Sequence, residues 1–452
     1  MKAKGLWVTL LVLMIMVTCG LIVSVAGIGV YWFTSVTTGI SSPDYIFSRV
    51  LEYGGLAQPS IQVERTETKT VALDSAKKLI IDNQYGDVSI QGVDMESDEI
   101  FISIYKSVWA QDEEAANQKL DVLTYEIKEE QGNLVLRGSY PPGALREPVW
   151  MHFTIEVPAD MDISSSSNGN IWVFNIAGEI DLTTSYGEIE VSETRGGKVK
   201  VTTSSGNITL QGLNMAEFPL SVSNGFGEVQ MENIHAASIL FSRASGIVEL
   251  ENIAVEGDIE IENNYNEISF INGKADTINF KTSSGKITLK GITVKTSVKA
   301  HTNYGDLDLK GVQAPEYDLF TQNGFINVKD VSQGTIKART DFGRVELTNL
   351  QSVVLDVKTV NGELLISGGL AKGNHNLFTE FGNITLRLPA NQSIDFDIKT
   401  DFGVINSQFP LTISGSLNEK DIQGKLGEGG GLLTVKTNNG NINIEKLTAE
   451  EE

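Results

Sequence analysis

A repeated unit of 18 to 21 residues, present from residue 168 onward, constrains the fold of this 452-residue chain more than any other feature. Each unit reads as an aromatic or small residue, glycine, any residue, an aliphatic residue, any residue and a second aliphatic residue, as in Tyr186-Gly187-Glu188-Ile189-Glu190-Val191. A fixed period of this length is typical of solenoids and repeat arrays. The repeated glycine, called here the anchor glycine, is found at Gly169, Gly187, Gly206, Gly227, Gly246, Gly285, Gly305, Gly324, Gly343, Gly362, Gly382 and Gly403, with Asn266 in its place once.

Apolar and polar residues alternate in two stretches of each unit. A period of two is typical of strands that bury one face. After Gly206, the residues expected to point inward are Ile208, Leu210, Leu213, Leu220 and Val222. After Gly305, they are Leu307, Leu309, Val312, Leu319 and Thr321. The sequence therefore predicts an all-β protein built from short strands and turns.

One such unit cannot bury its row of aliphatic side chains, whereas stacked units share a continuous core. Each buried aliphatic side chain then contributes about 1.5–3 kcal/mol before entropy is subtracted. Parallel crossovers within one sheet are nearly always right-handed, and the blades of a β-propeller need about twice this period. The prediction is a right-handed parallel β-solenoid (β-helix).

The residue before the anchor glycine alternates between small and aromatic side chains. Either each ring covers the small residue of the next coil, or a wider coil holds two units and places all rings along one edge. Corner packing is one role for the rings, and binding the faces of sugar rings is another. The small members are Asn168, Ser205, Ser245, Ser284, Asn323 and Asn361. The aromatic members, which form a candidate ligand-facing row, are Tyr186, Phe226, Tyr265, Tyr304, Phe342 and Phe381.

The single replacement of an anchor glycine by Asn266 indicates which backbone conformation this position adopts. Asparagine tolerates positive φ better than other non-glycine residues. We therefore expect a left-handed turn at the anchor position.

Residues 61–160 do not show the full repeat. Leu79–Ile90 resembles one solenoid coil, and apolar residues at helical spacing predict a short helix within Gln111–Thr124. Because an uncovered sheet edge invites aggregation, we expect this region to cap the solenoid. The predicted divisions are a cytoplasmic tip and transmembrane helix at 1–33, a spacer at 34–60, a capping β region with a short helix at 61–160, solenoid repeats at 161–446 and an acidic tail at 447–452.

The N-terminal segment predicts a single membrane span. Leu6–Phe33 is almost wholly apolar and longer than a bilayer core requires. Lys2 and Lys4 precede it, so the positive-inside rule places the N-terminus in the cytoplasm and the body outside. A cleaved signal peptide and a lipoprotein signal at Cys19 are alternatives, and both also leave the body outside the cytoplasm.

The net charge of −23 excludes some partners. A nucleic-acid partner would need a basic face, and an acidic body is repelled by anionic lipid surfaces. Cys19 is the only cysteine, so the folded body has neither disulfides nor thiol chemistry. The expected partners are the membrane, through the anchor, and a cell-wall or surface glycan or an envelope protein.

No enzymatic motif is present, and we expect no catalytic, metal or cofactor site. A polysaccharide lyase or hydrolase would need clustered carboxylates, and the best candidates are Asp341, Arg344 and Asp401. They stand at the same point of the repeat but three units apart, so two intervening coils should separate them. The four histidines, for which packing or solvated roles are expected, are His152, His235, His301 and His375.

Together these patterns resemble the bacterial putative-adhesin β-solenoid family, related to the adhesin head domains called GIN. The resemblance covers residues 65–446. It is carried by the segments Lys77–Ile81, Tyr85–Val88 and Val157–Asp160, and by the repeat units at Thr203–Leu210 and Thr282–Leu289. It implies an envelope protein associated with adhesion or envelope stress, and it supplies no active-site motif.

Three functions follow as hypotheses. The first is a non-enzymatic, membrane-anchored adhesion or binding scaffold. The second is a regulatory component of the envelope-stress response that acts through a membrane partner. The third, which is the least favoured, is a lyase-like enzyme.

Overall fold

The computed structural model describes residues 61–73, 76–94, 99–142, 148–414 and 419–447. The chain divides into two compact units. Of the described residues, the smaller contains those within 61–65, 107–122 and 141–149, and the larger contains those within 66–106, 123–140 and 150–447.

The smaller unit contains the short helix α3 (Glu113–Val122). The helix begins after Asp112, whose Oδ1 accepts a hydrogen bond from the backbone N of Ala115 at 2.8 Å. An aspartate at this position satisfies an otherwise unpaired amide of the first turn. Ala116 and Leu120 are buried. The prediction of a helix in this region is confirmed.

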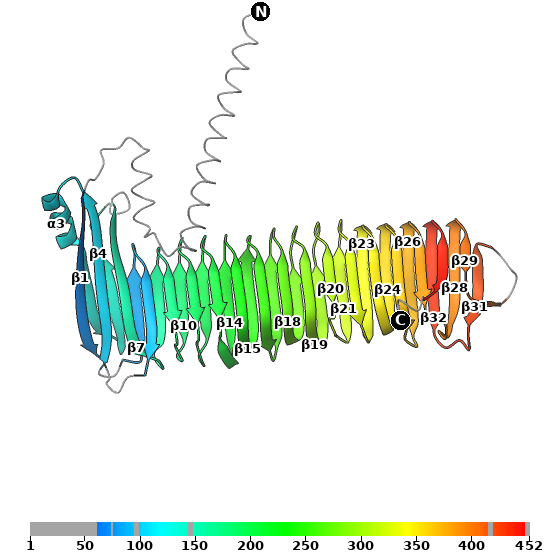
Figure 1. Ribbon diagram of the computed structural model, residues 1–452, viewed down its shortest axis with the longest axis horizontal. Coiled ribbons are helices and arrows are strands. Elements are labelled where there is room, and N and C mark those ends of the chain that lie inside the picture. The colour runs from blue at the N-terminus through cyan, green and yellow to red at the C-terminus, as the bar shows by residue number, and fades with distance from the viewer. Residues whose placement is uncertain (1–60, 74–75, 95–98, 143–147, 415–418, 448–452) are drawn as a thin grey trace, which may run out of the picture. The chain divides into compact units, whose positions relative to one another are not determined.

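The larger unit is an all-β solenoid of right-handed type with about 11 turns, and its strands stack in one direction (Figure 1). The strands before the repeats are β1 (Ile61–Ala72), β2 (Lys78–Asn83), β3 (Val88–Val93), β4 (Glu99–Ala110), β5 (Thr124–Glu130), β6 (Asn133–Ser139) and β7 (Val149–Pro158). The strands of the first repeats are β8 (Asp162–Ser167), β9 (Ile171–Phe174), β10 (Ile180–Thr184), β11 (Ile189–Ser192), β12 (Val199–Thr203), β13 (Ile208–Gln211), β14 (Asn214–Asn224), β15 (Val229–Ala244), β16 (Val248–Val255), β17 (Asp258–Asn263) and β18 (Ile268–Lys281).

The later strands continue the same stack. Those of the remaining repeats are β19 (Ile287–His301), β20 (Leu307–Lys310), β21 (Glu316–Thr321), β22 (Ile326–Val331), β23 (Gly334–Phe342), β24 (Val345–Asn361), β25 (Leu364–Leu370), β26 (Asn374–Phe381) and β27 (Ile384–Leu388). Those of the C-terminal end are β28 (Ile394–Phe402), β29 (Ile405–Ser407), β30 (Thr412–Ile413), β31 (Asp421–Leu426), β32 (Leu432–Asn439) and β33 (Ile442–Lys446).

Each coil contains one repeat unit and contributes a strand to each of two faces. On the first face, Leu182 of β10 lies in register with Val201 of β12. On the second face, Ile189 of β11 lies in register with Ile208 of β13. The paired residues are one unit apart in the chain, so the wider coil of two units is excluded.

The core of the solenoid is the continuous row of inward-facing aliphatic side chains. All ten residues predicted to point inward after Gly206 and Gly305 are buried, with exposed fractions of 0 to 2%. These positions are confirmed, because the period-two pattern fixes which side of each strand faces the core.

The chain also turns sharply where it leaves the strand of the second face, and this corner was not predicted. One residue in most coils adopts a left-handed conformation there, with φ between 53° and 66°. Asparagine and glycine dominate the position, as expected of the residues that best tolerate this backbone region. The members are Asn175, Glu193, Gly212, Asn233, Asn252, Asn272, Gly291, Gly311, Asp330 and Asn349.

The first coil is formed by β2 and β3, which lie before the non-repeating segment. They pair in parallel with β8 and β9, so the prediction of a coil at Leu79–Ile90 is confirmed. On the other side they pair with β6 and β7. The intervening segment therefore supplies strands that cover the first coil.

The last coils do not follow the order of the chain. β32 pairs in parallel with β26 on one side and β28 on the other, and β33 lies in the same way between β27 and β29. The chain forms the outer coil first and then returns to insert its final coil, seen in red before orange β28 in Figure 1. Antiparallel β31 covers the outer side of β28.

No helix among the described residues has the length and apolar character needed to cross a bilayer. The predicted span at residues 6–33 and the spacer at 34–60 lie outside the described residues.

Candidate functional site

Seven large aromatic side chains project from one corner of the solenoid, and we call this row the aromatic edge. Each precedes an anchor glycine or, in the case of Tyr265, its replacement Asn266, and each residue is at least half exposed. The members and their exposed fractions are Tyr186 (75%), Phe226 (67%), Tyr265 (65%), Tyr304 (63%), Phe342 (55%), Phe381 (51%) and Phe402 (73%). The first six were predicted as a candidate row, and Phe402 was missed.

The spacing of the aromatic edge follows from the coil. Because one coil holds one unit, the rings occur on every second coil. Two strand spacings of about 4.8 Å place successive rings about 9.6 Å apart along the axis. Register pairs show the alternation directly, since Phe342 lies beside Asn361 and Asn361 lies beside Phe381.

Phe402 keeps the two-coil spacing of the row because the last coil is inserted between it and Phe381. Asn439 is in register with Phe381 on one side and with Phe402 on the other. In chain order, the Phe381 and Phe402 coils would be neighbours and their rings would be adjacent. The insertion therefore keeps rings and small residues alternating to the end of the stack.

The anchor glycines position the edge by allowing the coils to approach closely. A Cβ on Gly187 would lie 1.9 Å from the carbonyl oxygen of Gly169, and a Cβ on Gly305 would lie 1.8 Å from that of Gly285. Either contact is a severe clash. Glycine is required here because only a hydrogen fits between stacked turns.

The expectation of left-handed geometry at these glycines is wrong for most of them. Among the anchor glycines of the repeats, Gly227 alone has positive φ. The physical requirement is close stacking rather than backbone handedness. Asn266 is outside the left-handed set, and its side-chain amide donates to the carbonyl oxygen of Ser245.

A buried threonine, three residues before the anchor glycine, holds many of the turns together. Thr302 Oγ1 donates to the Gly285 carbonyl oxygen at 3.0 Å and accepts from the Gly305 N at 3.2 Å. A buried hydroxyl with both roles satisfied links one coil to the next. Equivalent bonds to the anchor-position glycine of the neighbouring coil are made by Thr184, Thr203, Thr321, Thr340, Thr359, Thr379, Thr400 and Thr437.

Every ring of the aromatic edge has a carboxylate within two residues of it in the chain. For the first four rings the acidic residue follows the anchor position, and for the last three it precedes the ring. The seven residues are Glu188, Glu228, Glu267, Asp306, Asp341, Glu380 and Asp401. Rings and carboxylates therefore recur together on alternate coils.

Glu188 is a half-buried member of this acidic set. The structure shows no hydrogen bond or ion pair from its carboxylate to any described residue. Burial raises the pKa of the Glu188 carboxyl, and the neighbouring Glu190 raises it further. By contrast, Asp306 Oδ1 accepts a hydrogen bond from the Phe325 N at 2.8 Å.

At Tyr85, the equivalent position of the first coil, another side chain covers the aromatic ring. Tyr85 precedes Gly86, and its ring makes an edge contact with Tyr140 at a centroid distance of 4.9 Å. The Tyr140 hydroxyl donates to the Tyr85 carbonyl oxygen at 2.5 Å. The seven edge rings are far more exposed than this covered ring.

The candidate catalytic residues do not meet. Asp341 and Asp401 lie on coils separated by those of Gly362, Gly382 and the inserted Gly440. Four strand spacings make this about 19 Å along the axis. The separation is three coils rather than the two predicted, because the final coil lies between them. Arg344 instead pairs with Glu346 at 2.9 Å.

The histidines are dispersed, and no three His, Cys, Asp or Glu side chains in the described part of the chain converge as metal ligands. His152 Nδ1 lies 3.2 Å from Asp87 Oδ2. His375 is buried, and burial lowers its pKa. Its Nδ1 accepts from the Leu355 N at 3.3 Å, so its Nε2 carries the proton given to the Ala371 carbonyl oxygen at 3.0 Å.

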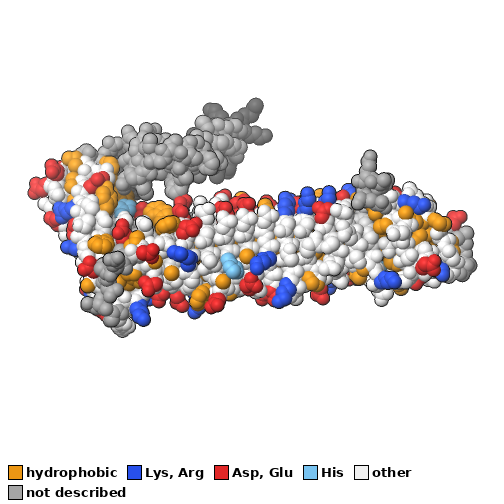
Figure 2. Space-filling view, turned by 60° about the horizontal axis from the view of Figure 1, so that its bottom comes forward, with side chains coloured by type: hydrophobic (Ala, Val, Ile, Leu, Met, Phe, Trp, Pro, Cys, Tyr) orange, Lys and Arg blue, Asp and Glu red, His pale blue; other side chains and the backbone are white. Residues whose placement is uncertain are grey.

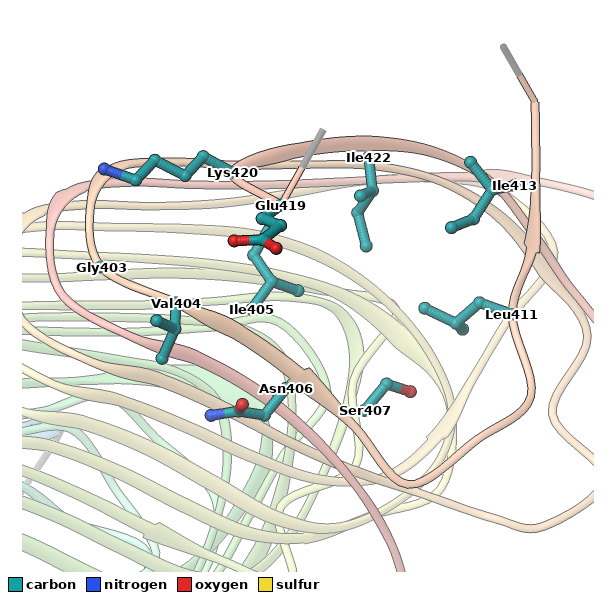
Figure 3. Close-up of a pocket in the computed structure, with 10 residues that line it drawn as sticks. All are labelled: Gly403, Val404, Ile405, Asn406, Ser407, Leu411, Ile413, Glu419, Lys420 and Ile422. Carbon is teal, nitrogen blue, oxygen red and sulfur yellow. The ribbon is translucent and has the colours of Figure 1, made fainter. Parts of the chain in front are cut away.

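A cavity of about 420 Å³ lies at the C-terminal end of the solenoid (Figure 3). Aliphatic side chains dominate its lining, among them Ile405, Leu411, Ile413 and Ile422. Glu419 lies among them, whereas the Lys420 chain extends away along the rim. Of the polar lining residues, Ser407 donates its hydroxyl proton to the Phe409 carbonyl oxygen at 3.1 Å and Lys420 Nζ donates to the Asp401 carbonyl oxygen at 3.2 Å.

The visible face of the repeat region carries acidic side chains along its length, with apolar side chains scattered between them (Figure 2). Basic side chains also lie on this face, which is therefore a mixed surface. The aromatic edge is distinguished from it by its regular spacing.

Comparisons with known proteins identify a family. The family model described as Toastrack DUF4097 matches residues 158–222, 198–290 and 261–445. A "putative cell adhesion protein" from Clostridium sporogenes is similar at 10% identity and a TM-score of 0.16, covering 85% of this chain and 100% of that one. A "putative adhesin" from Bacteroides fragilis is similar at 16% identity and a TM-score of 0.21, covering 69% of this chain and 99% of that one. No curated protein matches.

Proposed function

Because the chain belongs to the Toastrack DUF4097 family and carries an exposed aromatic edge, we propose that it is a non-enzymatic binding scaffold of the cell envelope. In this proposal residues 6–33 anchor the chain in the membrane as a single span. The N-terminus lies in the cytoplasm, and the solenoid lies outside it. The edge contacts a cell-wall or surface glycan or an envelope protein.

The observation that carries this proposal is the exposure of seven large rings on one corner, from 51% to 75%. Exposed apolar side chains that recur in a fixed arrangement are a common mark of interaction surfaces. The stacked glycines and threonines hold the positions of the rings rigidly. A rigid surface loses little conformational entropy when a ligand binds.

The dispersion of the titratable groups supports a role without catalysis. The two best candidate carboxylates are about 19 Å apart along the axis, which is far beyond the separation of paired carboxylates in glycosidases. The net charge of −23 favours ligands without strong negative charge.

A sedimentation assay with isolated cell envelopes tests the proposal. The full chain in detergent micelles is compared with a Tyr186/Tyr265/Tyr304→Ala variant and a Leu240→Ala variant. Leu240 is 50% exposed on the first face, away from the edge, and serves as the matched control. We expect saturable binding that is lost in the triple variant and kept in the control. Binding that is equal in all three would contradict the role of the edge, and no binding would favour action through a membrane partner.

A further inference from the structure

The aromatic edge repeats with a period of two coils, or about 9.6 Å. Extended β-1,4-linked glycans have a disaccharide repeat of nearly the same length, because successive sugar rings are turned over relative to each other. The same face of the sugar therefore recurs once in every disaccharide. A chain lying along the edge would present one equivalent sugar face to every aromatic ring.

The residues between the rings are suited to the polar rim of such a glycan. Ser205, Ser284, Asn323, Asn361 and Asn439 are exposed on the intervening coils. Hydroxyl and amide groups both donate and accept hydrogen bonds, as sugar hydroxyls do. Ser245, between Phe226 and Tyr265, is half-buried. The edge thus alternates an apolar platform with an exposed polar group along most of its length.

The carboxylates beside the rings favour one class of glycan. Sugar hydroxyls donate well to carboxylates, since charge-assisted hydrogen bonds are stronger than neutral ones. Glu188, which follows Tyr186 by two residues in the chain, is half buried, and its carboxylate has no partner among the described residues. The same charges repel uronic acid and phosphate groups. An anionic polymer is therefore disfavoured.

We propose that the aromatic edge binds an extended β-1,4-linked hexopyranose glycan without anionic groups, with one disaccharide per two coils. This inference rests on the proposed function, since it requires the edge to be a binding surface. Each edge ring stacks on the apolar face of alternate sugars, and the intervening polar residues contact the sugar rims.

Binding of the full chain to defined glycans tests the ligand class. The probes are chitin and cellulose, with amylose as the α-linked control and polygalacturonate as the anionic control. Soluble chitin oligosaccharides of two, four and six sugars test the period. We expect binding to the β-1,4-linked probes only, and affinity that rises with each added disaccharide.

A variant that moves one ring separates spacing from apolar character. Tyr304→Ser combined with Ser284→Tyr keeps the number of rings but places one on the wrong coil. We expect it to weaken binding of the six-sugar oligomer by about tenfold, which is the effect of removing a stacked ring. Leu240→Ala should leave the affinity unchanged, and circular dichroism should show that all variants are folded.

The outcomes distinguish this inference from the proposed function. Undiminished glycan binding by the ring-moving variant overturns the period argument. Edge-dependent binding to cell envelopes without binding to chitin or cellulose overturns the ligand class and keeps the binding function. Failure of both assays overturns both.

Discussion

Phe381 and Asn439 lie in register on neighbouring strands, although the whole Phe402 coil lies between them in the chain. Asn439 is also in register with Phe402. The alternation of rings and small residues is therefore a property of the stack in space. Chain order alone would have placed two rings on adjacent coils at this end.

Cysteine pairs can test the inserted coil directly. Lys436 is in register with Phe378 on one side and with Lys399 on the other. In a Cys19→Ser background, we expect Phe378→Cys with Lys436→Cys to form a disulfide, because paired strands place Cα atoms within bonding range. Phe378→Cys with Lys399→Cys should not, since a coil lies between them. Mass spectrometry after mild oxidation detects the disulfide. The opposite pattern would show that the last coils stack in the order of the chain.

Gly305→Ala should strongly destabilise the solenoid. The added Cβ would lie 1.8 Å from the Gly285 carbonyl oxygen, and we expect a loss of about 3 kcal/mol in the free energy of unfolding. Gly311→Asn is the matched control, because asparagine occupies the same corner in other coils. Urea unfolding compares the two. Equal losses would show that close stacking at the anchor position is not the constraint.

Thr302→Val removes a hydroxyl that links two coils. The Gly305 N and the Gly285 carbonyl oxygen would each lose a buried partner, and we expect a cost of about 1–3 kcal/mol. Thr302→Ser keeps the hydroxyl and should cost less than about 1 kcal/mol, mainly through the lost methyl group. Thermal unfolding measures both. A serine variant as unstable as the valine variant would assign the effect to packing alone.

His375 should make stability depend on pH. Burial lowers its pKa in the folded state, so the unfolded chain binds the proton at higher pH. The stability from neutral His375 is present above the unfolded pKa of about 6.5 and is lost as the pH falls through the folded pKa.

Urea unfolding at pH 7.5 and 5.5 tests this linkage. The loss of stability on acidification should be smaller in His375→Gln than in the wild type. His235→Gln, at a side chain that is 41% exposed, is the control. An unchanged pH dependence in His375→Gln would contradict the assignment.

The repeat was sufficient to predict the solenoid and its inward residues, because strand periodicity and burial are local properties of each unit. Ile208 and Leu307 could be assigned from their neighbours in the chain alone. The order of the last coils could not, because it depends on which sheet edges meet in space. Phe402 was missed for that reason.

The anchor position was interpreted wrongly for a related reason. Glycine satisfies both a left-handed turn and a close contact, and a single sequence does not separate them. At Gly187 the decisive group is the Gly169 carbonyl oxygen, which belongs to another coil. The threonine bonds between coils, as at Thr302, were likewise visible only once the stacking partner was known.

In the proposed function, the aromatic edge is the surface that contacts the ligand. Hydroxyl-radical footprinting of the full chain, with and without isolated cell envelopes, measures this directly. We expect bound chain to show reduced oxidation at Tyr186, Tyr265 and Tyr304, with Leu240 unchanged. Undiminished oxidation of the edge rings, together with protection of Leu240, would place the contact on a flat face instead of the aromatic edge.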